Sequence, residues 1–341
     1  MRFLSNGATG LAAVLLVFLL PAAAADERPN LKHPVPVIEQ RLHGPLTIEG
    51  MEQARPSIEG DRSARVELSA TGDLPAMAVK WKPVAPPGEG FNNEPRYELA
   101  AYRLQKMFLD ECEYVVPPVV LRALPSAEYS RLRDSEPPTL RRIDSVVFML
   151  SYWLSNVSPD ETWDPERFER DPRYARHWGN LNILTHLIDH KDANYGNLLI
   201  SRNPGDPRVF AVDSDVAFAA RASDRGDEWR RLHVDRLPED TLERLRGLSR
   251  RDLDRELGVL AEFRVENDQL VPVHPPGRNL SPGIGVRTSG DRVQFGLTTE
   301  EIRQLWRRLS RMLSQVNRGR IESVARTEHS IGAACLGVAA Q

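Results

Sequence analysis

The segment THLIDHKDANYGNLLISRNPGDPRVFAVDSDVAF, from Thr185 to Phe218, is the part of the chain that decides the fold. Within it, Asp192 follows His190 by two positions and precedes Asn197 by five. A carboxylate accepts protons, and carboxylate and amide oxygens are the ligands that Mg²⁺ prefers. The segment therefore places a candidate base and a candidate metal ligand in one short loop.

A β-hairpin is predicted directly after this loop. Its strands are Leu198–Ile200 and Val209–Val212, with a turn between them, and the second strand ends on Asp213. The order His-x-Asp-x-x-x-x-Asn, hairpin, Asp is the layout of a kinase phosphotransfer site. On this interpretation Asp192 is the catalytic base, and Asn197 and Asp213 hold the metal ion on the phosphates.

The composition is that of an ordinary soluble globular protein. The chain has 341 residues, of which 41% are hydrophobic and 27% charged, and its formal net charge is −3. This near-neutral balance argues against a nucleic-acid partner, because nucleic-acid binders usually carry a basic stripe. The length allows one large two-lobed domain or two smaller ones.

The N-terminus is predicted to be an export signal. Arg2 gives a weakly positive start, Leu11–Leu20 is apolar but too short to span a bilayer, and Ala22–Ala25 offers a cleavage site before Asp26. The alternative is an uncleaved anchor. We expect a signal peptide over residues 1–25 and a mature protein that is periplasmic or secreted, with no transmembrane anchor.

Only two cysteines are present, Cys112 and Cys335. An oxidising compartment permits a disulfide between them, which would tie the C-terminal tail to the N-terminal half. Sequence spacing leaves the alternative of two unpaired thiols open, because it does not show whether their Cβ atoms meet.

The pattern of strands and helices predicts an α+β fold. We expect an extended lead-in over 26–45, a β-rich small lobe over 46–154, an α-helical large lobe over 155–328 and a tail over 329–341. Periodicity places strands at 46–48, 65–70, 76–83 and 145–154, helices at 94–109, 174–188, 241–263 and 299–316, and a loop at 272–290. The predicted architecture is the two-lobed one of protein kinases.

Two lysines and a glutamate complete the candidate site. Lys80 and Lys82 lie on the same face of the strand 76–83, and Lys82 is the candidate phosphate-binding lysine. One of these amines is expected to contact the α- and β-phosphates while pairing with a carboxylate on the following helix, for which we choose Glu98. Gly60 and Ser63, before the strand 65–70, are candidates for a loop that covers the phosphates.

Three short stretches resemble the small lobe of the secretory-pathway kinases, the family of the Golgi casein kinase and the proteoglycan xylosyl kinase. They are Lys82-Pro83, Tyr97–Leu104 (YELAAYRL) and Val116–Arg122 (VPPVVLR). The spacing of Asp192 and Asn197 is also similar to that of the phosphoinositide-kinase-like group. The resemblance implies phosphoryl transfer from ATP or another nucleoside triphosphate, with Mg²⁺ or Mn²⁺, to a hydroxyl of a protein, sugar or lipid.

Other functions stay open at this point. The stretch Asp213-Ser214-Asp215 lacks the glycine usual in kinases, which favours a pseudokinase that binds a partner without chemistry. A nucleotidyl transferase would use the same fold. A metal-dependent hydrolase is the third alternative, because His186 and His190 are four apart on a predicted helix and such a pair can share one metal ion.

Overall fold

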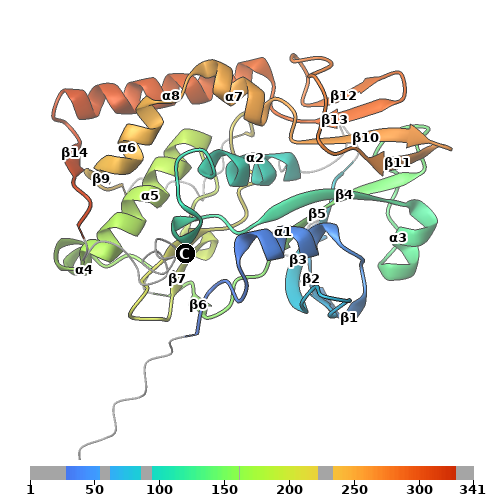
Figure 1. Cartoon of the computed structure of the whole chain (residues 1–341), viewed down its shortest axis with the longest axis horizontal. Coiled ribbons are helices and arrows are strands. Elements are labelled where there is room, and N and C mark those ends of the chain that lie inside the picture. The colour runs from blue at the N-terminus through green and yellow to red at the C-terminus, as the bar shows by residue number, and fades with distance from the viewer. Residues whose placement is uncertain (1–27, 54–61, 86–93, 161, 222–232, 328–341) are drawn as a thin grey trace, which may run out of the picture.

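The computed structural model describes residues 28–53, 62–85, 94–160, 162–221 and 233–327, which form two lobes (Figure 1). The smaller lobe is built on a five-stranded antiparallel sheet in the order β1-β2-β3-β5-β4. Its strands are β1 (Ile48–Gln53), β2 (Ala64–Leu68), β3 (Met77–Pro83), β4 (Val119–Pro125) and β5 (Ser145–Tyr152).

The predicted hairpin of 65–70 and 76–83 is present as β2 and β3, with Arg65 opposite Lys80. Alternation along β3 buries Val79 and Trp81 on the outer face of the sheet and directs Lys80 to the opposite face. Trp81 stacks on Phe148 of β5 with ring centroids 4.3 Å apart. Because Val79 and Trp81 must be buried on the outer face, Lys80 and Lys82 lie on the opposite face of β3.

The expected extended lead-in over 26–45 is wrong in its second half, where a helix, α1 (Val35–His43), is found. Val35, Ile38 and Leu42 are buried at helical spacing in a segment that looks polar on average. Together with α3 (Ser126–Leu132), α1 packs on β4 and β5. Ile38 and Leu42 pack with Trp81 on the outer face of the sheet, whereas Val35 packs in the core around α2, so the helix forms because its apolar side chains are buried on both sides.

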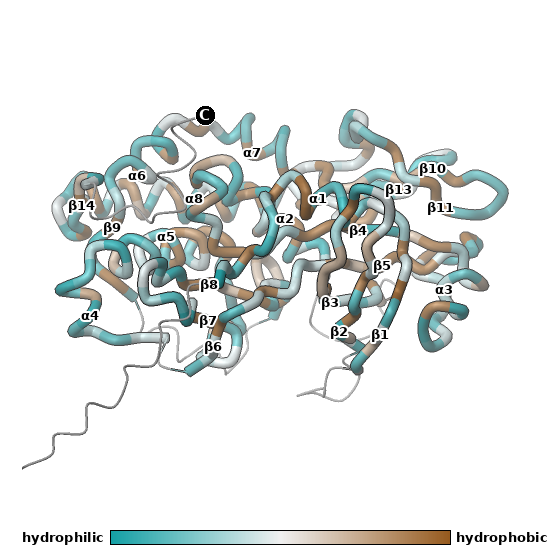
Figure 2. The backbone as a smooth tube through the Cα atoms, turned by 60° about the horizontal axis from the view of Figure 1, so that its bottom comes forward, coloured by the Kyte–Doolittle hydropathy of each residue, from teal (hydrophilic) through white to brown (hydrophobic). Residues whose placement is uncertain are grey.

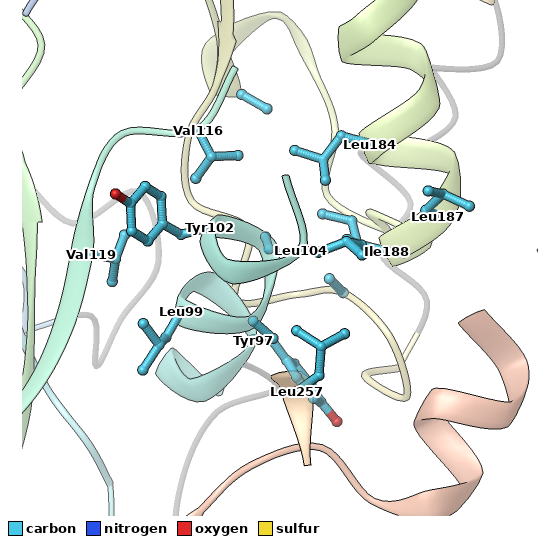
Figure 3. Close-up of a cluster of buried hydrophobic side chains, with 14 of the residues drawn as sticks. Tyr97, Leu99, Tyr102, Leu104, Val116, Val119, Leu184, Leu187, Ile188 and Leu257 are labelled. Atoms are coloured by element: carbon cyan, nitrogen blue, oxygen red, sulfur yellow. The ribbon is translucent and has the colours of Figure 1, made fainter. Parts of the chain in front are cut away.

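Helix α2 (Pro95–Gln105) lies between the two lobes, and of its residues only Arg103 is exposed. Figure 3 shows it surrounded by Leu184, Leu187 and Ile188 on one side, Val116 and Val119 on another, and Leu257 at its lower end. Figure 2 shows hydrophobic residues gathered where the sheet meets the helices and hydrophilic residues along α4 and α6. Close packing of its apolar side chains against both lobes leaves α2 little freedom to shift.

The larger lobe is mainly helical, as predicted. Its helices are α4 (Pro165–Arg170), α5 (Pro172–Ile188), α6 (Glu239–Arg246), α7 (Arg250–Leu257) and α8 (Thr299–Asn317). Two small sheets accompany them, one formed by β6 (Val157–Ser158), β7 (Leu198–Ser201) and β8 (Val209–Ala211), the other by β9 (Arg236–Pro238) and β14 (Glu322–Val324). The α+β fold class with a β-rich and an α-rich lobe is confirmed.

The single helix predicted over 241–263 is wrong. It is interrupted after α6 at Gly247, and α7 starts anew from a capping box in which Ser249 and Asp252 exchange hydrogen bonds. After Gly258 the chain turns into strand β10 (Ala261–Glu266). A local cap and a change from helical to alternating burial therefore override the continuous apolar pattern.

A second four-stranded sheet follows, in the order β11-β10-β13-β12. Its further strands are β11 (Gln269–Pro272), β12 (Val286–Ser289) and β13 (Arg292–Phe295), so the predicted loop over 272–290 is partly strand. This sheet reaches the small lobe: Asp144 N donates to Asp268 O at 2.7 Å, and Leu270 N donates to Ser145 Oγ at 3.0 Å. The two lobes are thus hydrogen-bonded to each other away from the segment that links them.

Several expectations fall outside the described residues. These include the signal peptide, Gly60 and Cys335. Cys112, in the short 3₁₀ turn Glu111–Glu113, takes part in a disulfide. No helix in the described ranges combines the length and the apolar character needed to cross a membrane.

Candidate active site

The hairpin predicted after Asn197 is present as β7 and β8, with Leu198 opposite Ala211. Val212 N donates to Asn197 O at 3.0 Å, so the residue before β7 is fastened to the residue next to Asp213. Asp213 adopts left-handed backbone, with φ 60°. Such a conformation is uncommon for aspartate, and it turns the chain sharply where β8 ends.

The Asp192–Asn197 loop is held by its own side chains. Asn197 Nδ2 donates to Asp192 O at 2.8 Å and to Asp192 Oδ2 at 3.0 Å. Asn194 accepts from Gly196 N at 2.9 Å, which caps the 3₁₀ turn Tyr195–Asn197. Both of these hydrogen bonds are donated by the amide nitrogen of Asn197. Neither uses the amide oxygen, which is the atom that would coordinate a metal ion.

Helix α5 delivers the chain to this loop. Asp171 caps its start by accepting from Arg173 N and Tyr174 N, and Asp189 ends it in left-handed backbone with φ 54°. His190 follows and is buried, and its burial lowers the pKa of the imidazole below the usual value. The buried His190 side chain helps to hold the Asp192–Asn197 loop that follows it.

The two lysines of β3 approach a cluster of carboxylates. Lys80 Nζ lies 2.5 Å from Asp213 Oδ1 and 3.6 Å from Glu98 Oε2. Lys82 is bonded to Asp215, and its Nζ lies 3.7 Å from Asp213 Oδ1. The lysine that pairs with Glu98 is thus Lys80, whereas Lys82 has its own carboxylate partner.

Glu98, Asp213 and Asp215 form a compact acidic group. One carboxylate oxygen from each lies within 4.8 Å of the others, an arrangement able to hold a metal ion. Glu98 is 1% exposed, and its Oε2 is buried without a hydrogen-bond partner. A buried oxygen left in this state is costly, and a divalent cation would satisfy it. The residues present therefore fit Mg²⁺ or Mn²⁺.

The charges in this group are strongly coupled. Burial alone would raise the pKa of Asp213, but Lys80 and Lys82 outweigh it and hold the pKa below its usual value. Burial and the adjacent Asp213 carboxylate raise the pKa of Asp215 to about 7. Although burial opposes it, the pKa of Lys80 is raised by Asp213 and Glu98. Two lysines thus face three carboxylates, and a cation would balance the excess negative charge.

The structure brings most of the predicted residues together. Lys80, Lys82, Glu98 and Asp213 meet in the acidic group. Asp192 and Asn197 are bonded to each other, and Asn197 O accepts from Val212 N, one residue before Asp213. Ser63 is buried at the start of β2, and Gly60 lies outside the described residues, so a phosphate-covering role for either stays a prediction.

Asp215 was not among the predicted site residues. Its signal in the sequence is the pair of carboxylates in Asp213-Ser214-Asp215, two positions apart. By contrast, the histidines of the hydrolase alternative do not belong to the candidate metal site, Glu98, Asp213 and Asp215, among the residues that the structure describes.

Comparison with known proteins gives little. No family model matches the chain, and no curated protein does. A search of solved structures finds similarity to a MAP kinase, LmaMPK10, from Leishmania major, with 12% sequence identity and a TM-score of 0.27. The match covers 54% of this chain and 50% of that one, so this chain spans half of the kinase it matches. A likeness of this size carries no argument about activity, which has to come from the site itself.

Proposed function

We propose that the chain is an atypical kinase that transfers the γ-phosphoryl group of ATP, or of another nucleoside triphosphate, to a hydroxyl group. One observation carries this proposal: the lysines of β3, Glu98 of α2 and Asp213 after β8 converge within ion-pair distance. Asn197, whose side chain is bonded to Asp192, is joined to this cluster through the backbone bond that it accepts from Val212. These residues come from distant parts of the sequence, and phosphoryl transfer needs this set of groups in one place.

Each group has a role in the proposed reaction. Asp213 and Asn197 would hold Mg²⁺ or Mn²⁺, with Glu98 and Asp215 close enough to contribute, and the bound ion would neutralise charge on the phosphates. Lys80 would contact the phosphates, because its side chain is 17% exposed whereas that of Lys82 is 6% exposed. Asp192, which is partly exposed, would accept the proton of the attacking hydroxyl.

The test is a transfer assay on the chain without residues 1–25. The protein is incubated with ATP labelled on the γ- or the α-phosphate, with Mg²⁺ or Mn²⁺, alone and with generic protein, sugar and lipid acceptors. We expect transfer of the γ-label only, and its loss in Asp213→Ala. The matched control is Asp291→Ala, because the Asp291 side chain is 62% exposed and belongs to the far sheet.

Other outcomes select other functions. Transfer of the α-label would favour a nucleotidyl transferase, which shares the requirement for a metal–triphosphate. Nucleotide binding without transfer of either label would favour the pseudokinase, to which the altered Asp213-Ser214-Asp215 stretch points. Zinc that copurifies in stoichiometric amount would favour a hydrolase.

We also propose that the protein is exported and belongs with the secretory-pathway type of kinase. The proposal is supported by the apolar run Leu11–Leu20 followed by Ala22–Ala25, and by the disulfide at Cys112. Cell fractionation and mass spectrometry of the mature N-terminus test it. A cytoplasmic protein that keeps residues 1–25 would contradict it.

A further inference from the structure

The start of helix α2 is tied to the large lobe by a buried ion pair. Arg96 lies two residues before Glu98, and its guanidinium group donates Nη1 to Glu301 Oε2 and Nη2 to Glu301 Oε1, both at 2.9 Å. This two-pronged geometry is the strongest and most directional form of an arginine–carboxylate pair. Since Glu301 belongs to α8, the pair joins the helix that carries Glu98 to the other lobe.

The pair is enclosed rather than solvated. The side chain of Arg96 is 7% exposed and that of Glu301 is 4% exposed. Arg96 Nη1 also donates to Gly296 O at 3.0 Å, and a Cβ at Gly285 would lie 2.5 Å from Arg96 Cζ. The guanidinium group is therefore packed against the backbone on either side of the β12–β13 hairpin, and Gly285 makes room for it.

Both ends of the pair are themselves fixed. Glu301 belongs to the capping box of α8, where Thr298 N donates to Glu301 Oε2 at 2.7 Å. On the other side, Tyr97 donates its hydroxyl to Glu301 Oε1 at 2.5 Å, so two consecutive residues of α2 hold the same carboxylate. Neither partner can follow a movement of the other without losing these bonds.

The same end of α2 also touches the metal-binding loop. Glu94 N, at the N-cap of α2, donates to Asp215 O at 3.0 Å. The first turn of the helix is thus fastened to α8 on one side and to the loop of Asp213 and Asp215 on the other. A shift of α2 relative to α8 would separate the buried charges of Arg96 and Glu301, which is strongly unfavourable.

We propose that Arg96 and Glu301 are positioning residues that hold α2 with Glu98 facing Lys80, so that the site is assembled without any modification or partner. This inference rests on the proposed function. Arg96 does not touch the acidic group, and it acts through the placement of Glu98, whose Oε2 lies 3.6 Å from Lys80 Nζ.

The experiment compares Arg96→Met and Glu301→Gln with wild type. The second variant keeps the size of Glu301 and one acceptor oxygen but replaces the other oxygen with an N–H donor. It therefore breaks the fork with the smallest change in volume, which protects the test if the first variant fails to fold. We expect kcat to fall on the order of 100-fold in each, the usual effect of a small misplacement of a reacting group, and the nucleotide KM to change far less. Arg96→Lys, which keeps the charge but loses the fork, should recover part of kcat.

A second measurement does not depend on activity. Amide hydrogen exchange over residues 97–105 of α2 should rise in Arg96→Met and stay at the wild-type level in Arg303→Met. Arg303 is the matched control because it pairs with Glu300 one residue away from Glu301 on α8, at a position where both side chains are exposed.

The outcomes separate the two proposals. Unchanged kcat in an active protein, a rise in KM alone, or an equal loss of kcat in Arg303→Met would overturn the positioning role. If wild type transfers no phosphoryl group, the proposed function fails, and the exchange measurement alone decides about the anchoring of α2. If amide hydrogen exchange rises across the whole protein and not specifically in α2, the positioning role of Arg96 and Glu301 would also be overturned.

Discussion

At the scale of single residues, the structure separates two lysines that are equivalent in the sequence. Lys80 and Lys82 lie on the same face of β3, and either can be expected to serve the phosphates. Lys80 contacts Asp213 and Glu98 at the site, whereas Lys82 is buried with Asp215. The two lysines differ because each meets carboxylates on other parts of the chain. The sequence of β3 alone does not show which carboxylates these are.

The two lysines should therefore respond differently to substitution. We expect Lys80→Met to lower kcat/KM on the order of 100-fold or more, because it removes a charge aimed at the phosphates. It should cost less stability than Lys82→Met, because the side chain of Asp213, the carboxylate nearest to Lys80, is 37% exposed. Lys82→Met should instead lower the free energy of unfolding, by about 3 kcal/mol, because it leaves Asp215 buried without its partner. Steady-state kinetics and urea unfolding of both variants check this. Loss of stability confined to Lys80→Met would contradict the assignment.

A second residue-scale prediction concerns pH. Because burial lowers the pKa of His190, the folded protein binds a proton there only at lower pH than the unfolded chain, whose imidazole titrates near pH 6.5. Stability rises with pH wherever the unfolded state binds more protons, so the free energy of unfolding should fall as the pH is lowered from 7 past 6.5. In His190→Gln this fall should be shallower between pH 7 and 5. Chemical unfolding at several pH values measures it, and an identical slope would refute it.

At the scale of elements, short-range signals predicted some segments well and missed others. The hairpin of β7 and β8 follows from apolar runs separated by turn residues. The hairpin of β10 and β11 has an equally local signal, Asn267-Asp268, both with left-handed backbone at φ 50° and 61°. The sequence pattern does not predict this hairpin, because the apolar residues before it continue the helical spacing of the preceding segment.

This hairpin allows a direct stability test. Two-residue turns with left-handed backbone at both positions favour Asn-Gly, because glycine adopts this conformation without strain. We expect Asp268→Gly to raise the free energy of unfolding by about 0.5–1 kcal/mol. The control is glycine at Asp291, an exposed residue of the same sheet where no such gain is expected. Differential scanning calorimetry or urea unfolding decides, and a loss of stability at Asp268 would disprove the turn assignment.

At the scale of the whole molecule, the lobes are held together at several places besides their covalent link. Figure 1 shows α2 between the sheet and the large lobe and β10–β13 beside both. The N-terminal segment also crosses the link: Ser155 N donates to Asn30 O at 3.1 Å, and Asn30 Nδ2 donates to Ser155 O and Asn156 O at 3.1 and 3.0 Å. The segment that follows the predicted signal thus fixes the junction of the lobes.

The contribution of the Asn30 segment to stability is measurable. Asn30 is 3% exposed, and Asn30→Ala removes the donor to Ser155 O and a donor to Asn156 O, which also accepts from Arg202 N. The substitution should lower the free energy of unfolding by about 1–2 kcal/mol. Asn317→Ala, at the exposed end of α8, is the matched control and should have almost no effect. Urea unfolding of the two variants gives the comparison. Equal free energies of unfolding of the two variants would show that the Asn30 segment does not stabilise the junction of the lobes.

The sequence by itself determined the two-lobed α+β architecture and the residue types of the site, because strand alternation, helical spacing and the Asp192–Asn197–Asp213 layout are local patterns. Only the tertiary structure decided that Lys80 is the lysine that faces Glu98, that Asp215 joins the acidic group, and that Arg96 finds Glu301 205 positions further along the chain. Pairings of this kind depend on which buried charges meet after folding. A repeating pattern along the chain cannot predict which distant residues come into contact, because packing decides those contacts.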